Sequence, residues 1–152
     1  MDFNDEKVKK AAELIQSFLN VIKTTTDFSR QNAESLGLSL QQMSIINILF
    51  SFPGSTLKNV TEKLSISKST GSISVDGLVK SGLVERSLSE TDRREISLKL
   101  TPKGEELSKK SQENAYSYKA MMIALEQFND QEVSSLLKMH HELLSGLKAV
   151  QL

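Results

Sequence analysis

Residues 56–82 constrain the fold of this chain more than any other stretch, because they predict two helices joined by a turn of two or three residues. In TLKNVTEKL the apolar residues share one side of a short helix. Ser67 can cap a longer helix over residues 68–81, and Gly82 can end it in the left-handed conformation. This is the helix-turn-helix layout, although its turn lacks the common glycine. Helical hairpins with no nucleic-acid role share the pattern, so DNA binding stays open at this point.

Two short strands are predicted directly after these helices. LVERSL and EISLKL flank the polar loop SETDRR, and Ile96, Leu98 and Leu100 alternate with polar residues as in a half-buried strand. A helix-turn-helix followed by such a wing can place its second helix in a major groove. The hairpin tip then lies over the phosphates or the minor groove.

The loop between the two strands carries Asp92, Arg93 and Arg94. A narrow minor groove concentrates negative potential and attracts an inserted guanidinium, which Asp92 can hold by a charge-assisted hydrogen bond. The alternative is a solvated hairpin whose charges only keep it soluble. For the loop taken alone, that simpler interpretation has at least equal weight.

Both ends of the chain are predicted to be helical. Apolar residues follow helical spacing from Val8 to Ile22, in a stripe wide enough to indicate burial on more than one side. The same spacing returns from Val133 to Leu147, after a capping-box pattern of asparagine and glutamate. Two more helices are predicted, one capped by Ser39 and stopped by a Pro-Gly pair, and one over residues 102–127.

Composition narrows the class of protein. The chain has 152 residues, of which 38% are hydrophobic, as expected for one domain or one protomer of a dimer. It has no cysteine, which excludes disulfides, thiolate nucleophiles and Cys-ligated zinc. With neither an apolar run of membrane-spanning length nor a signal-peptide pattern, we expect a cytoplasmic protein that does not enter membranes. The formal net charge is zero, but residues 56–110 carry 11 basic against 8 acidic residues.

Four motifs together resemble the MarR family of transcriptional regulators: SISKST, LVKSGLVER, DRR and SLKLTPKG. The resemblance implies a mainly α (α+β) fold, a winged helix-turn-helix with long N- and C-terminal dimerisation helices. It implies one MarR-type domain over residues 1–152, in which residues 1–36 and 102–152 form the dimerisation region and residues 39–101 bind DNA. It also implies a homodimer on a pseudo-palindromic operator of double-stranded DNA, with Asp92 orienting Arg94 for the minor groove. For Arg93 we predict a contact with a phosphate or with another group of the protein.

The second helix of the motif is predicted to read the major groove. By helical spacing, Ser74, Val75 and Leu78 face the core. The residues predicted to face the groove are Ser69, Ser72, Ile73 and Asp76, and those at the helix start placed for phosphates are Lys68 and Thr70.

Ile73 and Gly77 depart from the resemblance, because many family members have basic residues at these positions. Arginine readout of guanine by this helix is therefore in doubt. Serine hydroxyls contact several bases and isoleucine suits a thymine methyl, so we expect an A/T-rich site read in part by DNA shape. The alternative for Ile73 is ordinary core packing.

The resemblance also implies a repressor that a small aromatic effector releases from DNA. The residues predicted to line an effector pocket are Phe18, Phe28, Met43 and Tyr116. Each also fits an ordinary place in the core, and the sequence selects no ligand.

No catalytic motif or cofactor site is found. The chain lacks a Gly-rich phosphate loop, a Gly-x-Ser-x-Gly elbow and a His-Glu-x-x-His motif, so we do not expect an enzyme. His140 and His141 are helix neighbours that diverge by about 100°, so no metal site is predicted. The alternative function is a winged-helix module that binds proteins and no operator. Such a module has no need for arginines at the wing tip.

Overall fold

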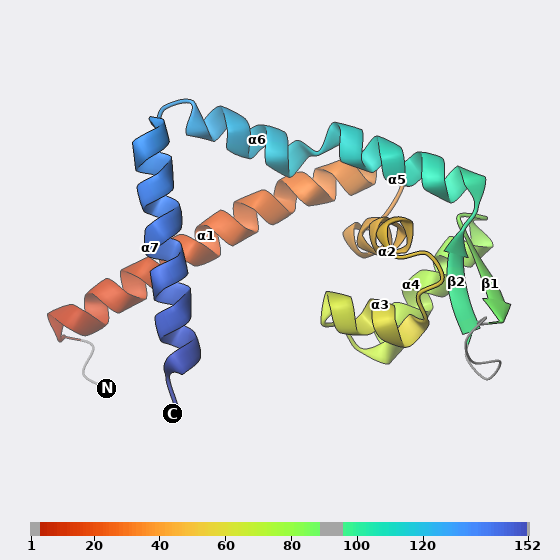
Figure 1. Cartoon of the computed structure of the whole chain (residues 1–152), viewed down its shortest axis with the longest axis horizontal. Helices are drawn as coiled ribbons and strands as arrows, with labels where there is room; N and C mark the ends of the chain where they lie inside the picture. The colour runs from red at the N-terminus through yellow and green to blue at the C-terminus, as the bar shows by residue number, and fades with distance from the viewer. Residues whose placement is uncertain (1–3, 89–95, 152) are drawn as a thin grey trace. The chain divides into compact units, whose positions relative to one another are not determined.

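The computed structural model describes residues 4–88 and 96–151, and the chain divides into two compact units, Met1–Ser117 and Tyr118–Leu152. The described part is mainly helical with one two-stranded sheet, as predicted (Figure 1). In chain order the elements are α1 (Glu6–Ser35), α2 (Leu40–Ser51), α3 (Leu57–Leu64), α4 (Lys68–Lys80), β1 (Val84–Leu88), β2 (Ile96–Leu100), α5 (Pro102–Asn114), α6 (Tyr116–Leu125) and α7 (Asp130–Ala149).

The helix starts that the sequence predicted are confirmed. Ser39 and Asn129 each form a capping box, with Gln42 and Glu132 respectively. Ser67 accepts a hydrogen bond from the backbone N–H of Thr70 at the start of α4. In each case a side chain satisfies a backbone N–H that has no partner within the helix, so the caps fix where the helices begin.

The single helix predicted over residues 102–127 is wrong. The structure has two helices there, α5 and α6, separated by Ala115 in the left-handed conformation with φ of 39°. The N–H of Ala115 still bonds to the carbonyl of Ser111, so α5 ends in a closed turn. Alanine favours helices, and nothing in the local sequence therefore indicated a break.

The hydrophobic core lies in the first unit, between the helices and the hairpin. Its largest fully buried apolar side chains come from α2, α3, α4 and β2, which pack on one another through their apolar faces. The largest are Ile45, Ile46, Leu49, Val60, Val75, Leu78 and Leu98. Burial of such side chains contributes roughly 1.5–3 kcal/mol each, so this cluster holds α4 against the rest of the unit.

The hairpin is antiparallel, with Val84 opposite Leu100 and Leu88 opposite Ile96. The predicted alternation in the second strand is wrong at its start, because Ile96 is 54% exposed whereas Ser97 is buried. Ser97 lies between Ser87, whose hydroxyl is 2.8 Å from its own, and Thr56, with which it forms an isolated bridge.

The end of the hairpin nearest the core is held by backbone hydrogen bonds to other segments. The N–H of Leu98 donates to the carbonyl of Ser55 at 2.9 Å, and the N–H of Thr101 donates to the carbonyl of Leu83 at 3.1 Å. The Leu88–Ile96 end has no such described anchor and exposes both apolar side chains. Among the described residues, the backbone of the hairpin is therefore anchored to other segments nearest its Val84–Leu100 end.

A buried polar cluster joins α2 to α5. Oδ1 of Asn47 accepts hydrogen bonds from the hydroxyls of Ser108 and Ser111, both at 2.8 Å. Asn32 on α1 donates from Nδ2 to the carbonyl of Ser111, also at 2.8 Å. Hydrogen bonds in a buried site have narrow geometric tolerance, so these contacts fix the relative positions of three helices.

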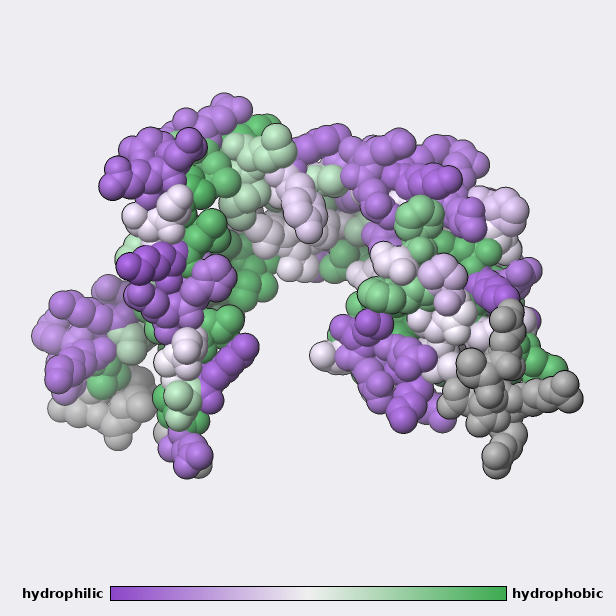
Figure 2. Space-filling view, in the orientation of Figure 1, coloured by the Kyte–Doolittle hydropathy of each residue, from purple (hydrophilic) through white to green (hydrophobic). Residues whose placement is uncertain are grey.

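The second unit exposes much of its apolar surface. Figure 2 shows hydrophobic side chains on its surface over α6 and along α7. The most exposed on α7 are Leu137, Met139, Leu144 and Leu147. In the first unit α1 has a comparable face, with Ile15, Leu19, Val21 and Ile22 each more than half exposed. Exposed apolar faces of this size are typical of surfaces that contact another molecule.

Candidate nucleic-acid interface

The helix-turn-helix is formed by α3 and α4, and the turn between them takes a conformation that glycine would normally supply. Ser65 is left-handed, with φ of 53°, and its N–H bonds to the carbonyl of Glu62 at 3.2 Å. The two helices also approach closely at Gly71. A Cβ built there would lie 2.4 Å from Cγ2 of Thr61, so only glycine allows this packing.

One face of α4 packs on the core and the opposite face is exposed. Val75 and Leu78 are buried, as predicted, and Ser74 is half-buried. Ser69, Ile73 and Asp76 are exposed, and Ser72 is half-buried. Ile73 is 73% exposed, which excludes the alternative that it packs in the core. Its contact with a base remains a prediction.

The start of α4 is a compact cluster of hydroxyl groups. Oγ of Ser67 lies 2.9 Å from Oγ of Ser69 and 2.7 Å from Oγ1 of Thr70. Lys68 is exposed beside them. Because the helix dipole also places partial positive charge at this end, the cluster offers donors and a favourable potential to a phosphate.

The predicted wing-tip residues Asp92, Arg93 and Arg94 lie outside the described residues. The two strands that flank them are those the sequence predicted, β1 and β2, paired in register from Val84–Leu100 to Leu88–Ile96. The role of the tip in a minor groove therefore stays a prediction.

Arg86 is a basic residue at this surface that the sequence analysis did not select. It lies on β1, and its Nη2 donates a hydrogen bond to Oδ1 of Asp76 on α4. The available signal was strand alternation, which places residues 84, 86 and 88 on one side of β1. Val84 on that side is buried, so the side chain of Arg86 leaves β1 on the side that packs on the first unit.

Among the described residues, shifted pKa values occur away from this surface, on α5. Lys110 hydrogen-bonds to Glu106 at 2.8 Å and lowers the pKa of that carboxyl, and the same contact raises the pKa of Lys110. Both side chains are more than half exposed, so the pair is an ordinary surface contact. The described residues contain no cluster of three or more metal-ligating side chains. No described helix is long and apolar enough to cross a membrane.

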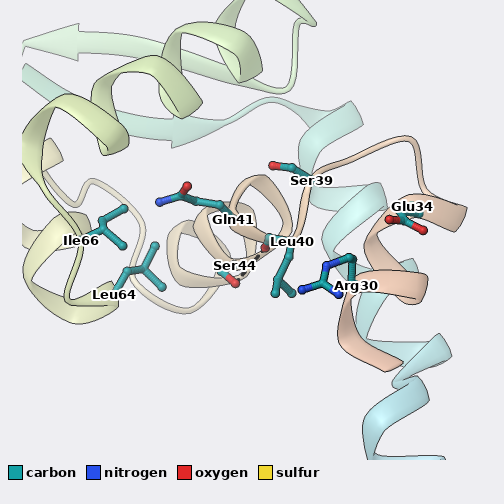
Figure 3. Close-up of a pocket in the computed structure, with 8 residues that line it drawn as sticks. All are labelled: Arg30, Glu34, Ser39, Leu40, Gln41, Ser44, Leu64 and Ile66. Carbon is teal, nitrogen blue, oxygen red and sulfur yellow. Dashed lines mark hydrogen bonds between the residues drawn. The ribbon is translucent and has the colours of Figure 1, made fainter. Parts of the chain in front are cut away.

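The four residues predicted to line an effector pocket do not line either of two cavities in the structure. Met43 is buried in the core, whereas Phe18, Phe28 and Tyr116 are half-buried. One cavity, of about 550 Å³, lies within the first unit between α1, α2 and the end of α3 (Figure 3). The other, of about 540 Å³, lies within the second unit beside α7. The predicted pocket remains a prediction.

The cavity in the first unit combines apolar and charged groups. Figure 3 shows Leu40, Leu64 and Ile66 on its apolar part, with Arg30 and Glu34 of α1 at one side. Arg30 is paired with Asp27 at 2.5 Å. The cavity lies where α1 meets the helices that precede α4.

Comparisons with known proteins agree with this architecture. A family model described as the MarR family matches residues 36–95. The crystal structure of a multiple antibiotic-resistance repressor (MarR) from Listeria monocytogenes 4b F2365 is 35% identical, with a TM-score of 0.67, and the match covers 95% of this chain and 98% of that one. FabT of Streptococcus pneumoniae, solved in complex with DNA, is 23% identical with a TM-score of 0.70, over 94% of this chain and 99% of that one. The HTH-type transcriptional regulator YkoM of Bacillus subtilis is 23% identical over 70% of this chain and 69% of its own length.

Proposed function

The chain belongs to the MarR family of DNA-binding transcriptional regulators, and from that premise we propose that it binds a pseudo-palindromic operator as a homodimer. In each protomer α4 enters the major groove and the wing lies over the adjacent minor groove. Regulators of this family are transcription factors and not enzymes, which confirms the prediction that the chain has no catalytic role.

The observation that carries this proposal is the exposed face of α4. Ile73, Ser69 and Asp76 point away from the core on a helix that is held by buried residues on its other side. A rigid helix with small polar groups and one aliphatic side chain on its free face can approach base edges in a major groove. The hydroxyl cluster and Lys68 at its start would then contact the phosphates.

The dimer is proposed from the apolar faces of α1 and α7. Each exposes several large aliphatic side chains at helical spacing, more than a monomer of this size normally leaves in water. A second copy of the chain would cover them, and two-fold symmetry would give two copies of α4 for two half-sites. Residues 1–36 and 102–152 are the proposed dimerisation region, and residues 39–101 the proposed DNA-binding region.

We further propose that the protein is a repressor released by a small aromatic effector. The relative from Listeria monocytogenes, which is named a repressor, supports the first part. The cavity of about 550 Å³ supports the second, because its size suits a small ligand and it adjoins both α1 and α3. A ligand that fits only one arrangement of these helices would shift the dimer toward that arrangement.

The test is to recover DNA fragments from the native genome with the purified protein and to footprint the bound sites. We expect two inverted half-sites on one face of the duplex, with centres about 34 Å apart. Affinity should fall steeply with salt concentration, because bound phosphates release counterions. If no duplex is retained at low salt, operator binding is wrong and the protein-interaction module becomes the better proposal.

A further inference from the structure

Arg86 and Asp76 link the wing to the exposed face of α4. The guanidinium of Arg86 on β1 hydrogen-bonds to the carboxylate of Asp76, and the two side chains are 40% and 56% exposed. Asp76 is one helical turn after Ser72 and Ile73, so it belongs to the same face of α4. The arginine is therefore held over the helix face that is proposed to meet DNA.

The register of the hairpin explains why Arg86 reaches α4. Arg86 is opposite Leu98, which is 1% exposed, and it alternates with Val84, which is 2% exposed. These neighbours belong to the side of the hairpin that packs on the unit. Arg86 itself is 40% exposed, and its guanidinium pairs with Asp76 on α4.

The charges on this face require an explanation beyond folding. An ion pair between exposed side chains contributes little to stability, so the pair has little structural effect. An unpaired Asp76 on a DNA-facing helix would repel phosphates. The basic residues of α4 itself, Lys68 and Lys80, are at its two ends, and the middle of its exposed face has serines and Ile73.

We propose that Arg86 contacts DNA and supplies the guanidinium that the recognition helix lacks, while Asp76 is a positioning residue that orients Arg86 and does not read a base. A guanidinium has five N–H donors, so an arginine held through one nitrogen can still donate to a phosphate oxygen or a base edge. This inference rests on the proposed function, because it requires that the exposed face of α4 meets the operator.

The experiment measures operator affinity and its salt dependence for Arg86→Ala, Asp76→Asn and the double variant. Arg86→Ala should weaken operator binding about 10- to 100-fold and lower the salt slope by about one unit for each lost phosphate contact. Asp76→Asn should weaken it less, because the guanidinium stays but is no longer oriented. In the Arg86→Ala background, Asp76→Asn should cost nothing or restore affinity, since it then removes an unpaired negative charge.

Three measurements make the result decisive. Lys110→Ala breaks an exposed lysine–glutamate pair on α5, away from this surface, and should leave DNA binding unchanged. Arg86→Lys keeps the positive charge but not the planar guanidinium. If it binds the operator as tightly as the unsubstituted protein, Arg86 contacts a phosphate. If it keeps the salt slope but loses preference for one base, Arg86 contacts a base edge. Melting temperatures should be equal for all variants, because the pair is exposed.

The inference and the proposed function fail in different ways. If the unsubstituted protein binds no operator, the proposed function is wrong. If it binds and Arg86→Ala binds with the same affinity and salt slope, Arg86 does not contact DNA. An equal loss for Asp76→Asn with and without Arg86 would show that Asp76 contacts DNA directly and overturn its positioning role.

Discussion

Ile73 presents an aliphatic side chain to solvent in the middle of a polar helix face. Ile73→Ala should relax preference at one thymine by about 1 kcal/mol, because the smaller side chain loses contact with the base methyl group. Non-specific binding and the melting temperature should hardly change. Affinities for the operator and for point variants of it give the measurement. An equal loss on every DNA sequence would mean that Ile73 does not read a base.

Gly71 and Gly77 lie on the same helix and differ in what a side chain would meet. Gly71→Ala should lower the free energy of unfolding by about 1–3 kcal/mol, because its Cβ would lie 2.4 Å from Thr61, which is itself buried. Gly77→Ala meets only the end of the Gln42 side chain, at 2.9 Å. Because that side chain also closes the capping box with Ser39, its shift should offset the gain in helix propensity of about 1 kcal/mol, and the free energy of unfolding should hardly change. Chemical denaturation compares the two. Equal effects would contradict the packing described for α3 and α4.

At the scale of elements, the role of the wing tip was predicted from the sequence alone. Arg94→Ala should weaken operator binding by about 1–3 kcal/mol and reduce the salt slope by about one unit per lost contact in each wing. Folding stability should barely change, because a charge on an exposed hairpin contributes little. Asp92→Ala should cause a smaller loss, since the guanidinium remains but is not held. Binding assays over a salt series decide the point, and unaltered affinity and slope for Arg94→Ala would make the wing an ordinary solvated hairpin.

Helix starts were predictable from the sequence because capping is a local contact. Ser39, Ser67 and Asn129 each bond to a backbone N–H three residues away, and sequence spacing alone specifies that geometry. The break at Ala115 and the burial of Ser97 were not predictable in this way. Ser97 is buried by segments about 10 and 40 residues away, Ser87 and Thr56, so its environment depends on the tertiary fold.

The same limit applies to the candidate site. The exposed face of α4 followed from helical period once Val75 and Leu78 were assigned to the core. The contact between Arg86 and Asp76 joins a strand to a helix. The sequence period of a strand or a helix shows which side of the element a residue lies on, but not which residue of another element it contacts. The sequence of a loop between two strands gives the residue types but not where their side chains lie. The predicted role of Asp92 and Arg94 in the minor groove therefore still depends on the family resemblance.

At the scale of the whole molecule, the apolar faces of α1 and α7 predict a dimer. The unsubstituted protein should sediment as a dimer at micromolar concentration, and its melting temperature should rise with concentration. Leu19→Glu on α1 should shift the equilibrium toward monomer, because it places a charge in an apolar contact. Leu88→Glu is the control, since Leu88 is equally apolar and 68% exposed but lies on the wing. A stable monomer for the unsubstituted protein would remove the dimeric architecture.

Backbone hydrogen bonds to other segments hold the hairpin near its Val84–Leu100 end, and this determines which of its own hydrogen bonds open in the native state. The amides of Leu98 and Thr101, which bond to Ser55 and Leu83, should exchange with deuterium only when the first unit unfolds. Amides near Leu88 and Ile96 should exchange much faster, through fraying that leaves α4 intact. On the proposed operator, the Leu88–Ile96 end of the hairpin would then adjust to the width of the groove while α4 keeps its place.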